Sequence, residues 1–283
     1  MKTKEWQILD IINWSKDYFE KKNVDSPRLT IELILCNVLN LARVDLYTSF
    51  DKPLKQNELD SIKSMINKRI ERIPLQYIFG QVEFYDLNFF VNSDVLIPRP
   101  ETEEIVDLII KDANKEKELN ILDIGTGSGC IALSLASKLN NANINAIDFS
   151  IPALKIAKQN KDNLNIDNVK LIHADIIKTI PKKKYDIVVS NPPYISTSEM
   201  NTLEQELTYE PEIALTDYSD GLEFYRRFVT IFKDILSTNG MFYLEINNNL
   251  SNEILKMFRD QYDVELIYDI SENPRIIKGS VKN

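Results

Sequence analysis

Three of the seven glycines in this chain fall within five residues, at Gly125, Gly127 and Gly129. They follow an apolar run over residues 120–124, which has the length and composition of a buried strand. The run after them has apolar residues at helical spacing, such as Ala132 and Leu135. Because glycine lets a backbone turn tightly and approach a ligand closely, this segment predicts a strand–turn–helix unit whose turn holds a ligand. The spacing of the turn excludes a P-loop.

Polar residues stand at the ends of three further apolar runs. Residues 142–147 end at Asp148, residues 169–174 end at Asp175, and residues 185–190 end at Asn191. In a doubly wound sheet, a carboxylate at the end of the second strand is placed to accept hydrogen bonds from ribose hydroxyls. Each aspartate alone is also a common helix N-cap. Together with the glycine turn, these strand ends predict a nucleoside pocket at the carboxyl edge of a parallel sheet, with Asp175 placed for an adenine amino edge.

The tetrapeptide Asn191-Pro192-Pro193-Tyr194 carries the most informative chemistry in the chain. The prolines remove two amide donors and fix φ, so they hold the neighbouring backbone carbonyls rigidly. The Asn191 side chain supplies another carbonyl, and Tyr194 supplies a flat ring. These groups suit a planar –NH2 group, with acceptors for both of its hydrogens and a ring to stack against. The alternative is an ordinary strand-ending turn, because Asn-Pro is frequent in turns.

Several motifs resemble those of a known family. The GTGSG turn, Asp148 and the NPPY tetrapeptide resemble the class I S-adenosylmethionine-dependent methyltransferases that modify planar amino groups. The PRPETE segment at residues 98–103, the segment from Glu210-Pro211 to Ala214-Leu215 and GLEFYR at residues 221–226 are similar to the release factor glutamine methyltransferases, the PrmC/HemK family. The resemblance runs nearly from end to end of the chain.

This resemblance implies both a fold and a reaction. The fold is α/β, a Rossmann-like class I methyltransferase sheet with a small N-terminal helical bundle and a connecting β-hairpin. The reaction transfers a methyl group from S-adenosyl-L-methionine to the side-chain amide nitrogen (N5) of the glutamine in the GGQ motif of peptide chain release factors. The protein substrate is then a release factor, and we expect a monomeric, cytoplasmic enzyme.

The resemblance also implies roles for individual residues. The expected catalytic residues are Asn191, Pro192 and Tyr194. The expected cofactor-binding residues are Gly125, Thr126, Gly127, Ser128, Gly129, Asp148, Asp175, Ile176 and Asn191. The expected substrate-binding residues are Asn191, Pro192, Pro193, Tyr194, Arg99 and Glu101.

The chain departs from the family pattern at two places. The family commonly has an aromatic residue after the acid of the third strand, whereas Ile176 stands here, so aliphatic packing replaces stacking on the adenine. The stretch over residues 244–249 has Asn where similar sequences have Gly, although Asn tolerates the left-handed conformation better than most residues.

The chain divides into three segments by its patterns. Residues 1–76 contain apolar residues at helical spacing and predict a helical substrate-recognition domain. Residues 77–97 become strand-like from Tyr77 onward and predict a β-hairpin linker that turns at Asp86. Residues 98–283 form the expected S-adenosylmethionine-binding catalytic domain, with a final pair of strands closing a mostly parallel sheet by an antiparallel edge.

Composition excludes several other classes of site. The net charge of −9 argues against a partner held through a phosphate backbone, so we expect no direct nucleic-acid contact. No apolar run is long enough for a membrane span, and the N-terminus leads into an amphipathic pattern rather than a secretory signal. Cys36 and Cys130 indicate buried thiols in a reducing compartment. A single histidine, His173, provides no zinc cluster or catalytic triad, and we expect no metal.

Three other functions compete with this interpretation. A DNA adenine N6-methyltransferase uses the same kind of grip on the exocyclic amine of a flipped base. A ribosomal-protein glutamine methyltransferase belongs to a related branch of the family. A non-catalytic S-adenosylmethionine-binding module is the third alternative, and the intact NPPY tetrapeptide disfavours it.

Overall fold

A computed structural model describes residues 5–282 of the chain. Residues 1–4, which belong to the expected signal-free N-terminus, and residue 283 lie outside the described residues. The chain splits into two compact units, Met1–Gly80 and Gln81–Asn283, and the hairpin falls within the second unit. Within residues 5–282, no helix combines the length and the apolar character that a membrane crossing requires.

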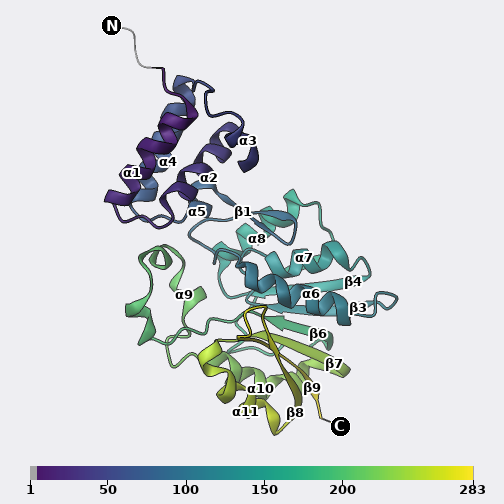
Figure 1. The fold of residues 1–283 in the computed structure, drawn as a ribbon. Helices are drawn as coiled ribbons and strands as arrows, with labels where there is room; N and C mark the ends of the chain where they lie inside the picture. The colour runs from purple at the N-terminus through teal and green to yellow at the C-terminus, as the bar shows by residue number, and fades with distance from the viewer. Residues whose placement is uncertain (1–4, 283) are drawn as a thin grey trace. The chain divides into compact units, whose positions relative to one another are not determined.

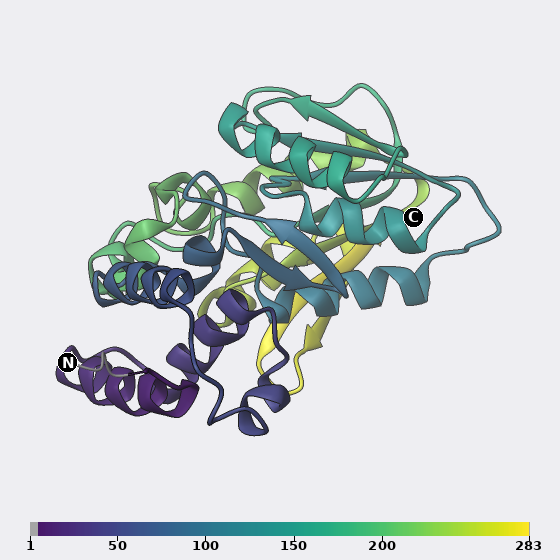
Figure 2. The ribbon, with the colours of Figure 1, turned by 90° about the horizontal axis from the view of Figure 1, so that it is seen from above.

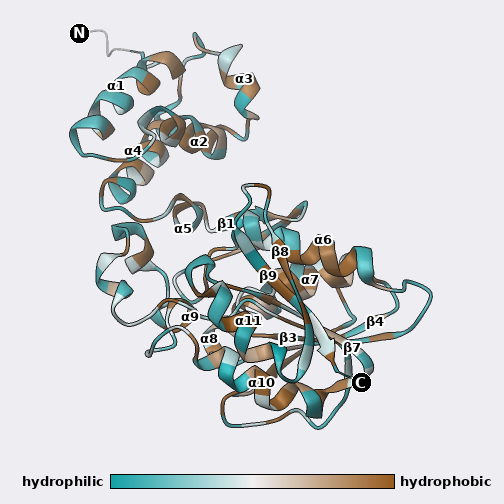
Figure 3. Ribbon diagram, turned by 60° about the horizontal axis from the view of Figure 1, so that its bottom comes forward, coloured by the Kyte–Doolittle hydropathy of each residue, from teal (hydrophilic) through white to brown (hydrophobic). Residues whose placement is uncertain are grey.

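The first unit is helical. Its helices are α1 (Ile8–Lys21), α2 (Pro27–Leu39), α3 (Arg43–Tyr47), α4 (Gln56–Ile70) and α5 (Leu75–Phe79). Pro27 occupies the first turn of α2, where a missing N–H costs nothing. Apolar residues of α1, α2 and α4 form one buried cluster, and Figure 3 shows brown residues concentrated on α2. The predicted helical bundle is confirmed.

Helix α5 differs from the strand-like pattern that the sequence analysis assigns to residues from Tyr77 onward. The segment begins a helical turn after Pro74 and ends at Gly80, whose φ is +73°. Leu75 and Phe79 pack against the helical core of the first unit. Burial on a helical bundle therefore overrides the strand propensity of an aromatic and β-branched run.

The hairpin of the second unit pairs β1 (Gln81–Phe84) with β2 (Leu87–Phe90). Tyr85 and Asp86 form its two-residue turn with φ of +52° and +60°, as the primed turns of hairpins require. Phe84 and Phe89 are buried in a cluster with residues of α6 (Glu103–Asp112) and α7 (Cys130–Lys138). In Figure 2 the blue hairpin lies beside these helices.

The second unit contains a seven-stranded sheet in the order β5-β4-β3-β6-β7-β9-β8. Its strands are β3 (Leu119–Ile124), β4 (Ala142–Asp148), β5 (Val169–His173), β6 (Tyr185–Ser190), β7 (Leu236–Glu245), β8 (Tyr262–Tyr268) and β9 (Pro274–Val281). All neighbouring pairs from β5 to β7 are parallel, and β9 is antiparallel to both of its neighbours. The predicted α/β sheet, with its antiparallel closing pair, is confirmed.

Helices cover both faces of this sheet, as Figure 1 shows. On one face lie α6, α7 and α8 (Ile151–Asn163); on the other lie α10 (Glu223–Ile235) and α11 (Ser251–Arg259). Alternation along β3 explains this arrangement: Ile121 packs into one buried cluster and Leu122 into the other. The short α9 (Glu212–Leu215) and the 3₁₀ helices η1 (Pro100–Thr102), η2 (Glu199–Thr202), η3 (Gln205–Tyr209) and η4 (Asn248–Leu250) lie in connections.

The turn after β7 does not need a left-handed residue. Asn247 is extended, with φ −70° and ψ 126°, and its side chain accepts a hydrogen bond from the Asn249 amide. An asparagine side chain that caps its own turn replaces the backbone freedom of glycine here.

Candidate active site

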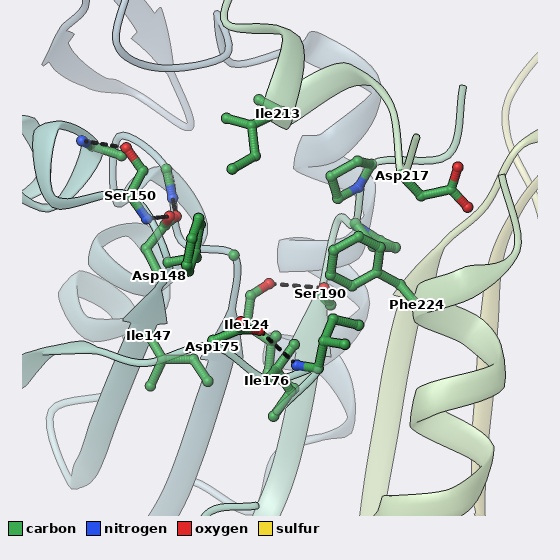
Figure 4. Close-up of a pocket in the computed structure, with 18 of the residues that line it drawn as sticks. Ile124, Ile147, Asp148, Ser150, Asp175, Ile176, Ser190, Ile213, Asp217 and Phe224 are labelled. Carbon is green, nitrogen blue, oxygen red and sulfur yellow. Dashed lines mark hydrogen bonds between the residues drawn. The ribbon is translucent and has the colours of Figure 1, made fainter. Parts of the chain in front are cut away.

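A cavity of about 370 Å³ lies at the carboxyl ends of four neighbouring strands. The segments after β3, β4, β5 and β6 all contribute to its wall: Gly125 and Gly127, Asp148, Asp175 and Ile176, and Asn191 with Pro192 and Pro193. These strands are adjacent in the sheet, so the polar residues that end them meet at one edge. In Figure 4 Asp148 and Ser150 lie on one side of the cavity, Phe224 lies on the other, and Ile213 lies above.

The glycine turn leaves open space above its backbone. Gly125 and Gly127 have φ of +73° and +55°, and an added Cβ at either position would meet nothing within 4 Å. The carboxylate of Asp148 fixes this turn from β4, because its Oδ2 accepts the Gly127 amide at 2.8 Å and its Oδ1 accepts the Ser150 amide at 2.8 Å. Burial raises the pKa of Asp148, although hydrogen bonds from backbone amides oppose this. The open backbone and the adjacent carboxylate fit a nucleoside ligand.

The other three residues of the turn lie outside the cavity wall. The hydroxyl of Thr126 donates to Asp123 Oδ2 at 2.6 Å. Ser128 is buried, and its carbonyl oxygen accepts from Asn160 Nδ2 at 2.9 Å. Gly129 has φ of +84°, and a Cβ there would lie 3.0 Å from a Leu133 side-chain carbon. These residues therefore shape the turn and its packing on the helices behind it.

The end of β5 contributes a partly engaged carboxylate. Asp175 Oδ1 accepts the Ile177 amide at 2.9 Å, and Oδ2 lies 3.2 Å from Lys178 Nζ. Ile176 is buried at the cavity wall. The aromatic ring on this side comes instead from Phe149, which is 52% exposed and lines the cavity directly after Asp148. Phe149 was not expected from the sequence, and its position directly after Asp148 at the end of β4 is the signal that points to it.

Asn191 connects the cavity to a buried hydrogen-bond chain. Its Nδ2 donates to Thr102 Oγ1 at 3.3 Å, and the Thr102 hydroxyl donates to Glu245 Oε2 at 2.7 Å. Thr102 and Glu245 are 3% and 2% exposed. Thr102 belongs to the PRPETE segment and Glu245 ends β7, so the chain joins three distant parts of the sequence.

Three expected substrate residues lie outside the cavity wall. Tyr194 packs against the buried cluster under α10, and burial is the main cause that raises its pKa, with Glu245 contributing. Arg99 Nη2 donates to Glu210 Oε1 at 2.5 Å. The same Glu210 carboxylate accepts the Ile97 amide at 2.9 Å, so the proline-rich segment is tied to the loop before α9. Glu101 is exposed.

Residues far downstream in the sequence complete the cavity. Ile213 of α9, Thr216, Tyr218 and Phe224 of α10 line it, and the sequence analysis named none of them as a site residue. The carboxylate of Asp217 points away from the cavity in Figure 4 and accepts the amides of Gly221 and Glu223 at 3.0 Å each. This cap fixes the start of α10 and hence the position of Phe224.

Gly221 touches the tetrapeptide directly. Its φ is +84°, and an added Cβ would lie 2.5 Å from the Tyr194 carbonyl oxygen. We expect Gly221→Ala to lower the free energy of unfolding by about 2 kcal/mol and to lower turnover as well, because the clash displaces the backbone after Pro193. Chemical denaturation and methyl-transfer assays measure both effects. Gly80→Ala, at φ +73° and outside the cavity wall, is the control for a substitution in the same region of backbone conformation. Equal turnover in the two variants would contradict this assignment.

Two buried carboxylates give stability a defined pH dependence. Burial raises the pKa of Asp123 and of Glu245 to about 7 each, against the hydrogen bonds that they accept from Thr126 and Thr102. A carboxyl whose folded pKa exceeds its unfolded value contributes stability at low pH that is lost as pH rises through the folded pKa. We therefore expect the free energy of unfolding to fall between about pH 5 and about pH 8.

The variant Asp123→Asn tests whether the buried carboxyl of Asp123 causes this pH dependence. We expect the variant to reduce the fall in the free energy of unfolding between about pH 5 and about pH 8 by on the order of 2 kcal/mol, measured by urea denaturation. Asp263→Asn, at an exposed carboxyl on β8, is the control and leaves the fall unchanged. An Asp123→Asn protein with the wild-type pH dependence would refute the assignment.

Among the residues that the structure describes, no group of three or more His, Cys, Asp or Glu side chains is arranged to hold a metal ion. The cavity wall carries backbone carbonyls, the carboxylates of Asp148 and Asp175 and the carboxamide of Asn191. An open glycine turn beside a carboxylate, next to a strand end with carbonyl acceptors, suits transfer of a group from a nucleoside-bearing donor to a planar amine.

Comparisons with known proteins agree with this geometry. The PrmC N-terminal domain matches residues 10–80, and the methyltransferase small domain matches residues 103–219. A release factor glutamine methyltransferase from Geobacter sulfurreducens is 38% identical over 254 residues, which cover 89% of this chain and 88% of that protein. One from Fusobacterium nucleatum is 38% identical over 274 residues, covering 95% of this chain and 77% of that protein.

A solved structure supports the fold. The crystal structure of a methyltransferase from Pyrococcus furiosus matches this chain with a TM-score of 0.53 at 20% identity, covering 75% of this chain and 98% of that one. The alignments with the two sequence relatives cover most of each relative and most of this chain. The chain therefore belongs to the release factor glutamine methyltransferase family.

Proposed function

We propose that this protein transfers a methyl group from S-adenosylmethionine to the N5 amide nitrogen of the glutamine in the GGQ motif of peptide chain release factors. The observation that carries the proposal is the position of Asn191. Its side chain stands at the cavity wall beside the glycine turn and Asp148, with its amide NH2 group engaged by Thr102. Family membership supplies the class of substrate.

The chain's own residues fit the cofactor. Gly125 and Gly127 leave the space above the turn open, so a ligand can approach the backbone closely. Asp148 accepts the backbone amides of Gly127 and Ser150, and its two oxygens have further lone pairs for ribose hydroxyls. Phe149 and Ile176 offer apolar surface for a base. The cofactor, when bound, supplies a methyl group on a positively charged sulfur.

A carboxamide nitrogen is a poor nucleophile, because its lone pair is delocalised into the neighbouring carbonyl. Asn191 Oδ1 and the backbone carbonyl of Pro192 accept its two N–H groups in the proposed complex. These two acceptors turn the lone pair toward the methyl group and stabilise the positive charge that develops on nitrogen. Positioning, rather than a titrating base, then supplies most of the acceleration.

The helical unit is the proposed site of release factor recognition. This unit matches the PrmC N-terminal domain and has a hydrophobic core of its own. Both observations support a role that differs from the role of the catalytic unit. A cavity of about 370 Å³ has the size of a small-molecule site, so selection of a whole protein needs a further surface.

The test is methyl transfer with a mass-spectrometric readout. The full-length protein is incubated with S-adenosylmethionine and an unmodified release factor, and the peptide that contains GGQ is analysed. The expected result is a gain of one methyl group on that glutamine, and none in a release factor whose GGQ glutamine is replaced by alanine. Duplex DNA, offered in parallel, is expected to stay unmethylated. Methylation of adenine without methylation of the glutamine would overturn the proposal.

A further inference from the structure

We infer that Thr102 and Glu245 act as positioning residues that fix which end of the Asn191 carboxamide faces the substrate. The inference rests on the proposed function, because it assigns a direction to the acceptor that grips the substrate amide. Its basis is the hydrogen-bond chain from Asn191 Nδ2 to Thr102 Oγ1 at 3.3 Å and from the Thr102 hydroxyl to Glu245 Oε2 at 2.7 Å.

The direction follows from the number of hydrogens available. An asparagine carboxamide has an oxygen at one end and an NH2 group at the other, and the two ends have nearly the same shape. The Thr102 hydroxyl has a single hydrogen. When that hydrogen is donated to Glu245, the hydroxyl oxygen can only accept from Asn191. The NH2 end of Asn191 is thereby held at Thr102, and Oδ1 remains for the substrate.

Loss of the Glu245 acceptor removes this bias. The Thr102 hydroxyl is then free to donate to Asn191, which stabilises the opposite orientation of the carboxamide. That orientation presents an NH2 donor to the NH2 group of the substrate, and two donors cannot form a hydrogen bond. The carboxylate of Glu245 therefore acts through two hydrogen bonds on a residue that it does not touch.

The fold holds the hydrogen-bond chain from Asn191 through Thr102 to Glu245 in a fixed arrangement. β6 and β7 pair with Ser190 opposite Leu244, so the next residues along, Asn191 and Glu245, are neighbours at the same sheet edge. Thr102 approaches them from the PRPETE segment, and both Thr102 and Glu245 are fully enclosed. The Tyr225 hydroxyl donates to the Glu245 carbonyl oxygen at 2.8 Å and anchors the backbone there. Buried side chains with this many restraints have few alternative rotamers.

The decisive variants are Thr102→Val and Thr102→Ser. Valine keeps the shape of threonine without the hydroxyl, whereas serine keeps the hydroxyl. We expect Thr102→Val to lower kcat about tenfold with an unchanged cofactor Kd, and Thr102→Ser to restore kcat to within about twofold of wild type. Thr30→Val removes a buried hydroxyl from the first unit and is the control for a loss of stability alone, with kcat unchanged.

A double-mutant cycle separates positioning from a structural role. In an Asn191→Ala background, Thr102→Val is expected to have no further effect on kcat beyond about twofold, because the group that it positions is absent. An equal tenfold loss in both backgrounds would overturn the inference. If Thr102→Val fails to fold, the Thr102→Ala and Thr102→Ser pair answers the same question.

The pH dependence of kcat supplies an independent readout. Three charged side chains influence the pKa of the Glu245 carboxyl: Arg99, Glu101 and Arg275. The same three side chains influence the pKa of Tyr194. With a pKa of about 7, Glu245 loses its carboxylate form as pH falls. The protonated carboxyl can donate to Thr102, and the Thr102 hydroxyl is then free to donate to Asn191. We expect wild-type kcat to fall between about pH 8 and about pH 6, and Glu245→Gln to lose that dependence.

These outcomes remain separate from failure of the proposed function. A wild-type protein that never methylates a release factor refutes the function itself. If the wild-type protein methylates the release factor and Thr102→Val is equally active, only the positioning role of Thr102 and Glu245 is refuted.

Discussion

Replacement of Asn191 by alanine is expected to lower kcat by about a hundredfold or more while the affinity for S-adenosylmethionine stays within about twofold of wild type. The physical reason is that the side-chain oxygen is used only when the substrate carboxamide is in place. The residues proposed to hold the cofactor, among them Gly125, Gly127 and Asp148, are left intact by the substitution. Single-turnover methyl transfer and calorimetry measure the two quantities.

A matched control uses another asparagine. Asn114 is exposed in the loop after α6, where its Oδ1 accepts the Glu116 amide. Asn114→Ala is expected to keep full turnover. Near-normal turnover in Asn191→Ala, or an equal loss in both variants, would contradict the role assigned to Asn191.

Replacement of Asp148 by alanine is expected to raise the Kd for the cofactor by about tenfold to a hundredfold, with a smaller change in kcat at saturating cofactor. Two losses add together here. The ribose hydroxyls lose their charged acceptor, and the glycine turn loses the bond from the Gly127 amide to Asp148 Oδ2. Calorimetric titration of the full-length protein measures the change.

Two graded variants sharpen this test. Asp148→Asn keeps one acceptor oxygen and is expected to lose less affinity than alanine. Asp175→Ala is expected to cost less than Asp148→Ala, because the Asp175 carboxylate is already engaged by the Ile177 amide and Lys178. An unchanged affinity in Asp148→Ala would rule out the ribose assignment.

The sequence predicts the strand ends of the site well, because their signals are local. A buried strand, a dense glycine turn and a helical period occur within about twenty residues, and each pattern has a direct physical cause. The same locality explains why the β1–β2 hairpin could be placed with its turn at Asp86. Parallel strands then bring their carboxyl ends to one edge without any further information.

Residues whose roles depend on tertiary packing could not be predicted in this way. Thr126 and Ser128 sit in the glycine turn, yet only Gly125 and Gly127 of this turn line the cavity, because the Thr126 hydroxyl turns to the buried Asp123 and Ser128 is itself buried. The Thr102–Glu245 hydrogen bond joins residues 143 positions apart. No local period connects such positions.

Helix α5 illustrates the same limit. It has strand-like composition and becomes helical through burial in the first unit, so packing against neighbouring elements decides its conformation. Helix α11 is a different case: no helix was assigned there from the sequence, although its buried Ile254, Leu255 and Phe258 lie at helical spacing.

The role of Asn191 is tested most sharply by a crystal structure of the full-length protein with S-adenosylhomocysteine and a GGQ-containing release factor. We expect the glutamine N5 to lie about 3 Å from both Asn191 Oδ1 and the Pro192 carbonyl oxygen, with Asn191 Nδ2 still bound to Thr102. A glutamine carboxamide bound elsewhere, or an Asn191 oxygen turned toward Thr102 in that complex, would contradict that role.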